Sequence, residues 1–110
     1  MDITMNKIAK FNEGVILEAA IEAAEGDEIL IPYEEADNKI IILVSNDGAG
    51  SGDITFEKGD MLQATEDLTI TVPAGKTIAV ALESGKFKKK NGNVKAIASA
   101  ELGIQLIALP

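Results

Sequence analysis

Hydrophobic and polar residues alternate along several short stretches of the chain. Ile54 and Phe56 fall on one side of such a stretch, and Leu68, Ile70 and Val72 repeat the same two-residue period further on. This alternation is typical of a β-strand with one buried and one solvated face. Extended along the sequence, the pattern predicts a core built from Ile40, Ile42, Val44, Ile54, Phe56, Leu68, Ile70, Val72, Ile78, Val80, Leu82, Ile104 and Leu106.

The stretch from Lys39 to Ser45 lacks the alternation, because its aliphatic run is unbroken. Such a run predicts a central strand that is covered on both faces. Turn residues such as Asn46-Asp47-Gly48 and Pro73-Ala74-Gly75 separate it from its neighbours. Short strands divided by turns in this way predict an all-β fold, an antiparallel β-sandwich of the Ig-like or jelly-roll-like kind.

The dipeptide Asn91-Gly92 is the strongest hairpin signal in the sequence. A type I′ turn requires positive φ at both central residues, which Asn and Gly tolerate. We therefore expect residues 87–90 and 94–99 to form antiparallel neighbouring strands. The glycine-rich residues 48–52 match neither a dinucleotide-binding nor a P-loop motif, and we interpret them as a flexible hairpin loop.

Residues 15–25 allow two interpretations. Ile16, Leu17 and Ala20 recur at helical spacing, and Gly26 stands where a helix would end. Val15 and Leu17, however, also fit the two-residue period of a strand. The sequence therefore allows at most one short helix near residues 15–25, and it leaves helix and strand both open.

The amino-acid composition excludes most types of catalytic residue. The 110 residues include no Cys, no His and no Trp, and all 10 basic residues are Lys. Disulfides, thiolate nucleophiles and imidazole bases are therefore excluded. We expect a single domain over residues 1–110 with no enzymatic activity, no catalytic residues and no cofactor.

A formal net charge of −8 argues against binding to nucleic acid or to an anionic membrane, since both require clustered basic residues. The longest aliphatic run, Ile40–Val44, is too short for a membrane span, and the first residues do not resemble a signal peptide. We expect synthesis in the cytoplasm. The acidic residues Asp47, Asp53, Glu57 and Asp60 lack the spacing of a calcium loop, so no metal site is predicted.

The basic residues gather in one place, at Lys86, Lys88, Lys89 and Lys90. Lysines on a strand at the edge of a sheet prevent it from pairing with other chains, and this is the interpretation that we favour for the cluster. The alternative is a docking patch for an acidic surface of a partner.

From Lys39 onward, the order of motifs resembles the capsid decoration and head-associated structural proteins of tailed bacteriophages. The resemblance rests on Ile40–Asn46, on Asp53–Asp60, on Asp67–Thr77 with its VPAGKT string, on Leu82–Phe87 with ESGKF, and on the final Ala108–Pro110. It implies a β-sandwich without enzymatic activity, located in the virion on the surface of the phage head. Lys86 departs from the pattern, because Arg is common there, and the N-terminal third matches only loosely.

These observations lead to one functional hypothesis and an alternative to it. We expect a structural virion protein that stabilises the capsid by binding the lattice of the major capsid protein, with homo-oligomerisation left open. The alternative is a carbohydrate- or peptide-binding β-sandwich module. The expected capsid contacts lie in an N-terminal arm, residues 1–12, and in the lysine cluster: Met1, Ile3, Lys7, Phe11, Lys86, Lys88, Lys89 and Lys90.

Overall fold

The computed structural model describes residues 1–110 except residues 2, 4 and 63. Its strands and its two short helical turns follow the chain in the order β1 (Met5–Lys7), β2 (Ile21–Ala23), β3 (Glu28–Pro32), the 3₁₀ turn η1 (Asp37–Lys39), β4 (Ile40–Ser45), β5 (Gly52–Phe56), β6 (Leu68–Val72), β7 (Thr77–Val80), α1 (Ser84–Phe87), β8 (Asn93–Ala98) and β9 (Leu102–Ala108). No helix in the described part of the chain is long and apolar enough to cross a membrane.

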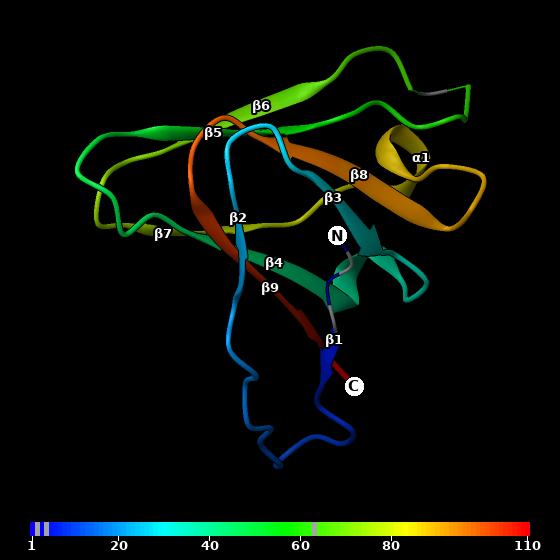
Figure 1. Cartoon of the computed structure of the whole chain (residues 1–110). Helices are drawn as coiled ribbons and strands as arrows, with labels where there is room; N and C mark the ends of the chain where they lie inside the picture. Colours follow the sequence, from blue (N-terminus) through cyan, green and yellow to red (C-terminus); the bar gives the residue numbers. More distant parts are fainter. Residues whose placement is uncertain (2, 4, 63) are drawn as a thin grey trace.

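The strands form two sheets packed face to face, so the chain has the all-β sandwich fold predicted from its sequence (Figure 1). A five-stranded sheet has the order β1-β9-β4-β7 with β2 also paired to β9, and a four-stranded sheet has the order β3-β8-β5-β6. The pairs β2 with β9, β3 with β8, β4 with β7 and β5 with β6 are all antiparallel. Along the chain, each strand from β2 to β5 thus pairs with one from β9 back to β6, in reverse order. This order of pairing is the jelly-roll arrangement.

Alternating side chains of the strands meet between the sheets. In β8, β4 and β5 every second residue is buried, and Phe56 and Ile54 are fully enclosed. Burying such side chains contributes roughly 1.5–3 kcal/mol each, which makes this alternation the main determinant of the fold. Ten predicted core residues are buried as expected: Ile40, Ile42, Val44, Ile54, Phe56, Val72, Val80, Leu82, Ile104 and Leu106.

The other three predicted core residues, Leu68, Ile70 and Ile78, are only partly buried. They belong to β6 and β7, which stand at the ends of the two sheet orders. A side chain on an edge strand is covered by neighbours on one side only, so its inward position does not guarantee full burial. The alternation predicted the correct face, and the position of the strand in the sheet decided the exposure.

β4 is central, as predicted, because it lies between β9 and β7. The prediction that both of its faces are covered is wrong. Ile40, Ile42 and Val44 are buried, whereas Ile41 and Leu43 on the opposite face are half-exposed. The sandwich has only two layers, so the outer face of this sheet has no further layer to cover it.

Residues 15–25 contain no helix. Residues 13–20 have no regular secondary structure, and β2 pairs antiparallel with β9 through Ile21 and Ala23. Gly26 has φ 85 and follows a strand instead of ending a helix. Pairing with the edge of β9 therefore overrides the helical spacing, as tertiary context often does for a short segment.

The region before β8 differs from the predicted hairpin. Residues 84–87 form α1, and only Lys88 forms a bridge with Val94 in the antiparallel sense. Gly92 has φ 88, but Asn91 is not in the positive-φ region, so the predicted type I′ turn is wrong. The N–H of Gly92 donates to the carbonyl of Lys89 at 3.0 Å, which closes a turn over Lys89–Gly92.

The glycine-rich residues 48–52 connect the two sheets and are not the loop of a hairpin, because β4 and β5 belong to different sheets. Asn46 organises this crossing and is only 2% exposed. Its Nδ2 donates to the carbonyls of Gly50 and Val72, both at 2.9 Å, and its Oδ1 accepts from the N–H of Gly48 at 2.9 Å. A buried amide with these partners holds the loop in one conformation.

Candidate functional site

The predicted N-terminal arm is divided by the structure into a packed part and a projecting part. The N-terminal amino group of Met1 donates to the carbonyl of Glu28 at 2.8 Å, and the carbonyl of Met1 accepts from the N–H of Leu30 at 2.8 Å. β1 then pairs in parallel with β9. The first residues therefore bridge the edges of both sheets instead of extending freely into solvent.

Ile3 is placed in the core by this arrangement. Its side chain is 4% exposed, and its N–H donates to the carbonyl of Leu30 at 3.3 Å. The predicted contact residue Ile3 therefore packs into the core of its own chain, where its side chain is already enclosed. Hydrophobicity near a terminus could not distinguish a core residue from a contact residue.

Lys7 is exposed on β1 and forms an ion pair with Glu35, with Nζ and Oε1 2.9 Å apart. The hydrogen bond and the positive charge of Lys7 lower the pKa of Glu35 below its ordinary value. Both side chains are largely solvated, so the pair contributes little to stability. Lys7 stays accessible to a partner, although its charge is partly neutralised by Glu35.

Residues 8–20 project from the body of the sandwich below both sheets (Figure 1). The chain turns at residues 10–12, where Asn12 has φ 67. Asn6 ties the returning part to the sheet: its Nδ2 donates to the carbonyl of Leu106 at 2.9 Å, and its Oδ1 accepts from the N–H of Glu18 at 3.1 Å.

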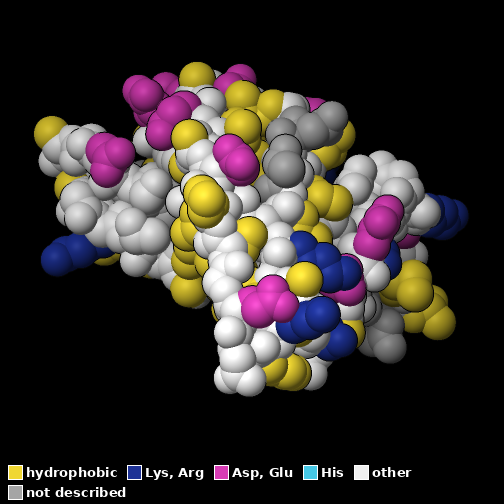
Figure 2. Space-filling model, turned by 90° about the horizontal axis from the view of Figure 1, so that it is seen from below, with side chains coloured by type: hydrophobic (Ala, Val, Ile, Leu, Met, Phe, Trp, Pro, Cys, Tyr) yellow, Lys and Arg dark blue, Asp and Glu magenta, His cyan; other side chains and the backbone are white. Residues whose placement is uncertain are grey.

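The projecting segment, residues 8–20, exposes large apolar side chains. Phe11 is 78% exposed and Ile16 is 87% exposed, and Val15 and Leu17 are exposed beside them. Figure 2 views the molecule from the side on which the segment projects and shows hydrophobic side chains gathered in a column through the middle of this face. Clustered exposed apolar side chains mark a surface that a partner covers.

The four lysines of the cluster do not form a strand. Lys86 is in α1, and its Nζ lies 3.7 Å from Oε1 of Glu83. Lys88, Lys89 and Lys90 follow in the turn, where Nζ of Lys89 donates to the carbonyl of Lys58 at 2.8 Å. The interpretation that these lysines protect an edge strand is therefore wrong. The strands at the ends of the two sheet orders are β1, β7, β3 and β6, and none of them contains a lysine of the cluster.

The two groups of predicted contact residues do not form one patch. Phe11 belongs to the projecting segment below the sheets, whereas Lys86 and the turn that follows it lie beside β8 at the other end of the molecule (Figure 1). A cavity of about 340 Å³ near the turn is lined by Met61 and by the lysines 88–90. The structure thus offers an apolar surface and a basic surface that are separate from each other.

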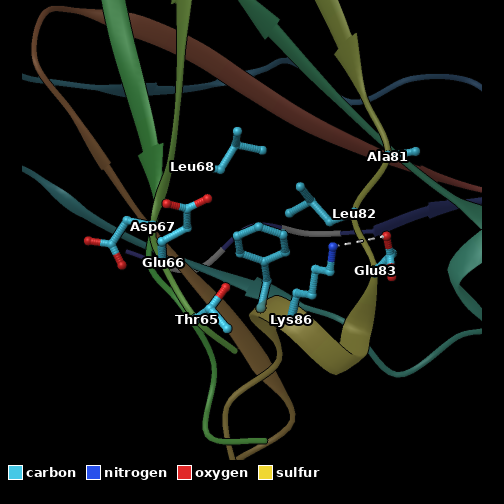
Figure 3. Close-up of a pocket in the computed structure, with 9 residues that line it drawn as sticks. Thr65, Glu66, Asp67, Leu68, Ala81, Leu82, Glu83 and Lys86 are labelled. Atoms are coloured by element: carbon cyan, nitrogen blue, oxygen red, sulfur yellow. Dashed lines mark ion pairs between the residues drawn. The ribbon is translucent and has the colours of Figure 1, made fainter. Parts of the chain in front are cut away.

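A second cavity, of about 310 Å³, is lined by residues 65–68 before and within β6 and by residues 81–83, 86 and 87 after β7. Figure 3 shows Leu68 and Leu82 pointing into it from opposite sides, with Lys86 turned towards Glu83. Phe87 also lines it. The cavity has an apolar floor and a charged rim that includes Glu66 and Asp67.

Three acidic residues of the loops and of β5, Asp53, Glu57 and Asp60, each have a separate partner. Oδ1 of Asp53 accepts from Oγ1 of Thr71 at 2.7 Å, Oδ2 of Asp60 accepts from the N–H of Lys90 at 2.7 Å, and Oε2 of Glu57 lies 3.4 Å from Nζ of Lys95. Within the described residues, no group of three or more acidic side chains is placed to hold a metal ion.

Comparisons of the chain with protein-family models, with curated proteins and with solved structures found no match.

Proposed function

We propose that the chain is a non-enzymatic structural protein of a phage virion, which binds the assembled lattice of a major capsid protein and decorates the surface of the head. The observation that carries the proposal is the projecting segment, residues 8–20, in which Phe11 stands 78% exposed on a rigid β-sandwich. A rigid scaffold with an apolar projection is suited to insertion between the subunits of a larger assembly, where the apolar side chain becomes buried.

The fold supports this proposal in a second way. Jelly rolls occur in viral capsid domains, although they also occur in lectins, so architecture alone does not select a function. A small sandwich bound at many equivalent lattice positions stabilises a shell through repeated identical contacts, each of which can be weak. The motif resemblance over residues 39–110 points in the same direction.

The alternative, a carbohydrate-binding module, is disfavoured by the placement of the aromatic residues. Sugar rings stack on exposed aromatic faces, but Tyr33 and Phe56 are 0% exposed and Phe87 is 8% exposed. Of the chain's aromatic residues, all of which are in the described part, only Phe11 faces solvent. One projecting ring does not provide a platform for a sugar chain.

Co-sedimentation with empty heads of the phage that encodes the chain tests the proposal. We expect the full chain to sediment with assembled heads and to show little affinity for isolated capsid subunits, because one subunit offers only part of a lattice site. Phe11→Asp should abolish co-sedimentation, since it places a charge where an apolar side chain is buried. Leu62→Asp is the matched control, because Leu62 is at least as solvent-exposed as Phe11 but lies in a different loop.

The lysine cluster is tested in the same assay by a Lys88→Glu, Lys89→Glu, Lys90→Glu variant over a salt series. Weakened binding with a strong salt dependence would assign the turn to the contact as well. Unchanged binding would leave the projecting segment as the attachment surface. If the intact chain never sediments with heads, the decoration proposal is wrong.

A further inference from the structure

The outer faces of the two sheets differ in charge. On the four-stranded sheet, Lys95 of β8 points outward, and its Nζ lies 3.1 Å from Oε1 of Glu28 and 3.4 Å from Oε2 of Glu57. Asp53 of β5 adds a carboxylate, whose Oδ1 accepts from Oγ1 of Thr71 at 2.7 Å. This outer face is therefore polar, and its charged groups already have partners.

The outer face of the five-stranded sheet is almost free of charge. Strand register places its side chains in three rows that cross the strands. The rows are Asn6, Ile107 and Ile41, then Gln105, Leu43 and Ala79, then Glu22, Gly103, Ser45 and Thr77. Glu22, at one corner of the third row, is the only charged residue among them. We call the first two rows the uncharged face.

The large aliphatic side chains of the uncharged face point away from the core. Ile41, Leu43 and Ile107 alternate with buried residues of β4 and β9, so they lie on the side opposite the other sheet. Each of them is partly exposed, and the described residues form only two sheets, so no third sheet covers them. Adjacent aliphatic side chains on an open face are typical of a surface that another molecule covers.

The uncharged face adjoins the projecting segment, residues 8–20. β1 and β2 both pair with β9, and the segment leaves the sheet after β1 and returns to it at β2 (Figure 1). Asn6, in the first row, accepts at Oδ1 from the N–H of Glu18 at 3.1 Å, which holds the returning chain at the border of the face. The exposed side chains of Phe11 and Ile16 are therefore tethered beside the uncharged face.

The size of the face distinguishes between partners. The three rows, about 6.6 Å apart, cross four strand positions about 4.8 Å apart, so they cover on the order of 400 Å². Each partner in a stable two-body complex buries about 800 Å². The face by itself is therefore too small to hold a second copy in a stable dimer. It is suited to a contact that is weak at each site and is repeated over a lattice.

The border of the face beside the third row is acidic. A cavity of about 300 Å³ there is lined by Glu22, Asp47, Gly48 and Glu101. None of the ion pairs between described residues involves these three carboxylates. A second copy, which has a net charge of −8, does not supply the positive charge that they attract. A partner with lysine or arginine beside an apolar patch complements both the border and the face.

We propose that the uncharged face lies against the phage head and contacts an apolar patch of the capsid lattice that has lysine or arginine next to it. The inference rests on the proposed decoration function and adds to it the orientation of the bound molecule. The five-stranded sheet faces the shell, the projecting segment inserts beside it, and the charged outer face of the four-stranded sheet faces solvent. The segment and the uncharged face together form one attachment surface.

Single-cysteine labelling tests which face the head covers. The chain has no cysteine, so Leu43→Cys and Thr55→Cys each introduce one reactive position. Both positions are outward and partly exposed on inner strands, Leu43 on β4 in one sheet and Thr55 on β5 in the other, so Thr55 is the matched control. We expect Leu43→Cys to lose its labelling by a maleimide when the chain is bound to empty heads. Thr55→Cys should be labelled as fast as in the unbound chain.

A charge placed on the face gives a second measurement. Leu43→Lys should weaken co-sedimentation with heads by about tenfold or more, because the contact would bury an unpaired ammonium group. Thr55→Lys, the control, should bind like the wild type. Glu22→Gln with Glu101→Gln should reduce the salt dependence of binding, since it removes carboxylates that attract the partner. Thermal unfolding without heads checks that the variants fold, and the cysteine pair decides if Leu43→Lys does not.

The outcomes separate this inference from the proposed function. If the wild type sediments with heads but Leu43→Cys stays reactive, or Leu43→Lys binds normally, the orientation is wrong and the decoration function stands. An unchanged salt dependence in the glutamine variant would overturn the basic character of the partner. If the wild type never sediments with heads, both proposals are wrong. Self-association without heads that Leu43→Lys abolishes would assign the face to a second copy and would overturn the inference as well.

Discussion

Single side chains in this protein have consequences that depend on where the sandwich places them. Phe56 and Phe11 are the same residue type, yet Phe56 is 0% exposed between the sheets and Phe11 is 78% exposed on the projecting segment. The first therefore contributes to folding and the second is free to contribute to binding. The two residues form a natural pair for comparison.

Truncation of Phe56 to alanine should lower the free energy of unfolding by about 3–5 kcal/mol, because it removes buried apolar surface and leaves a cavity. Phe11→Ala is the control and should change the free energy of unfolding by less than about 0.5 kcal/mol. Urea denaturation of the two variants measures both quantities. Equal effects of the two substitutions would contradict the assignment of Phe56 to the core.

Tyr33 links β3 to the chain that follows β7. Its hydroxyl donates to the carbonyl of Leu82 at 2.7 Å and accepts from the N–H of Leu82 at 3.1 Å, and the side chain is fully buried. Replacement by phenylalanine leaves both backbone groups of Leu82 unpaired, which should cost about 1–3 kcal/mol at neutral pH. The cost is measured by urea denaturation.

The same residue predicts a dependence on alkaline pH. Burial raises the pKa of Tyr33 above its ordinary value of 10.0, the hydrogen bond to Leu82 opposes this, and the charge of Asp37 adds to it. Above that ordinary value the unfolded chain loses the proton before the folded chain does, so stability falls as the pH rises. The difference in unfolding free energy between wild type and Tyr33→Phe should therefore shrink in alkali. A difference independent of pH would contradict this.

At the scale of elements, short connections hold α1 and the turn after it against the sandwich. The N–H of Gly59 donates to the carbonyl of Lys86 at 2.8 Å. The N–H of Asp60 donates to the carbonyl of Lys88 at 3.3 Å. These bonds dock the loop after β5 on the turn before β8. The lysine-rich sequence predicted a strand here, but the structure has a helical turn. The hydrogen bonds from Gly59 and Asp60 give the carbonyls of Lys86 and Lys88 partners without strand pairing.

Gly59 is the position where this docking leaves no room for a side chain. A Cβ there would meet the carbonyl oxygen of Lys88 and would lie 2.8 Å from the backbone carbon of Phe87. Gly59→Ala should therefore lower the free energy of unfolding by about 1–3 kcal/mol through overpacking. Gly50→Ala is the matched control, because nothing lies within 4 Å of the added Cβ. Thermal or urea unfolding should separate the two variants.

For the whole molecule, the N-terminal segment fastens the two sheets together along one side. Met1 and Ile3 contact β3 in one sheet, and β1 extends the other sheet through β9. The segment therefore belongs to the structural unit, and a deletion of the first residues tests stability as much as binding. The part that is free for partners is the projection that follows β1.

Deletion of residues 1–7 should lower the free energy of unfolding by about 3 kcal/mol or more, because it removes buried Ile3 and uncovers both edges. Replacing Val15, Ile16 and Leu17 by serine is the control, and it should leave the unfolding of the monomer nearly unchanged, since these side chains are exposed. Calorimetry at low protein concentration measures both variants. A deletion without effect would mean that the N-terminal segment does not hold the sheets.

The sequence by itself determined the fold class and most of the core. The two-residue alternation in residues 54–56, 68–72 and 78–82 depends only on the geometry of an extended chain, so it could be read without knowledge of partners. It could have located β3 as well, since Ile29, Ile31 and Tyr33 alternate in the same way and are all buried. Composition likewise sufficed to exclude cysteine and histidine chemistry.

Only the tertiary structure decided which strands lie at edges and which apolar residues stay exposed. Ile3 and Ile16 are the same residue type near the same terminus, but one is enclosed by β3 and the other projects into solvent. Residues 15–25 fit two periods, and the unpaired edge of β9 selected the strand at β2. Whether a side chain is buried and which strands pair depends on residues that are distant in sequence. The local pattern of hydrophobic and polar residues therefore does not predict either one.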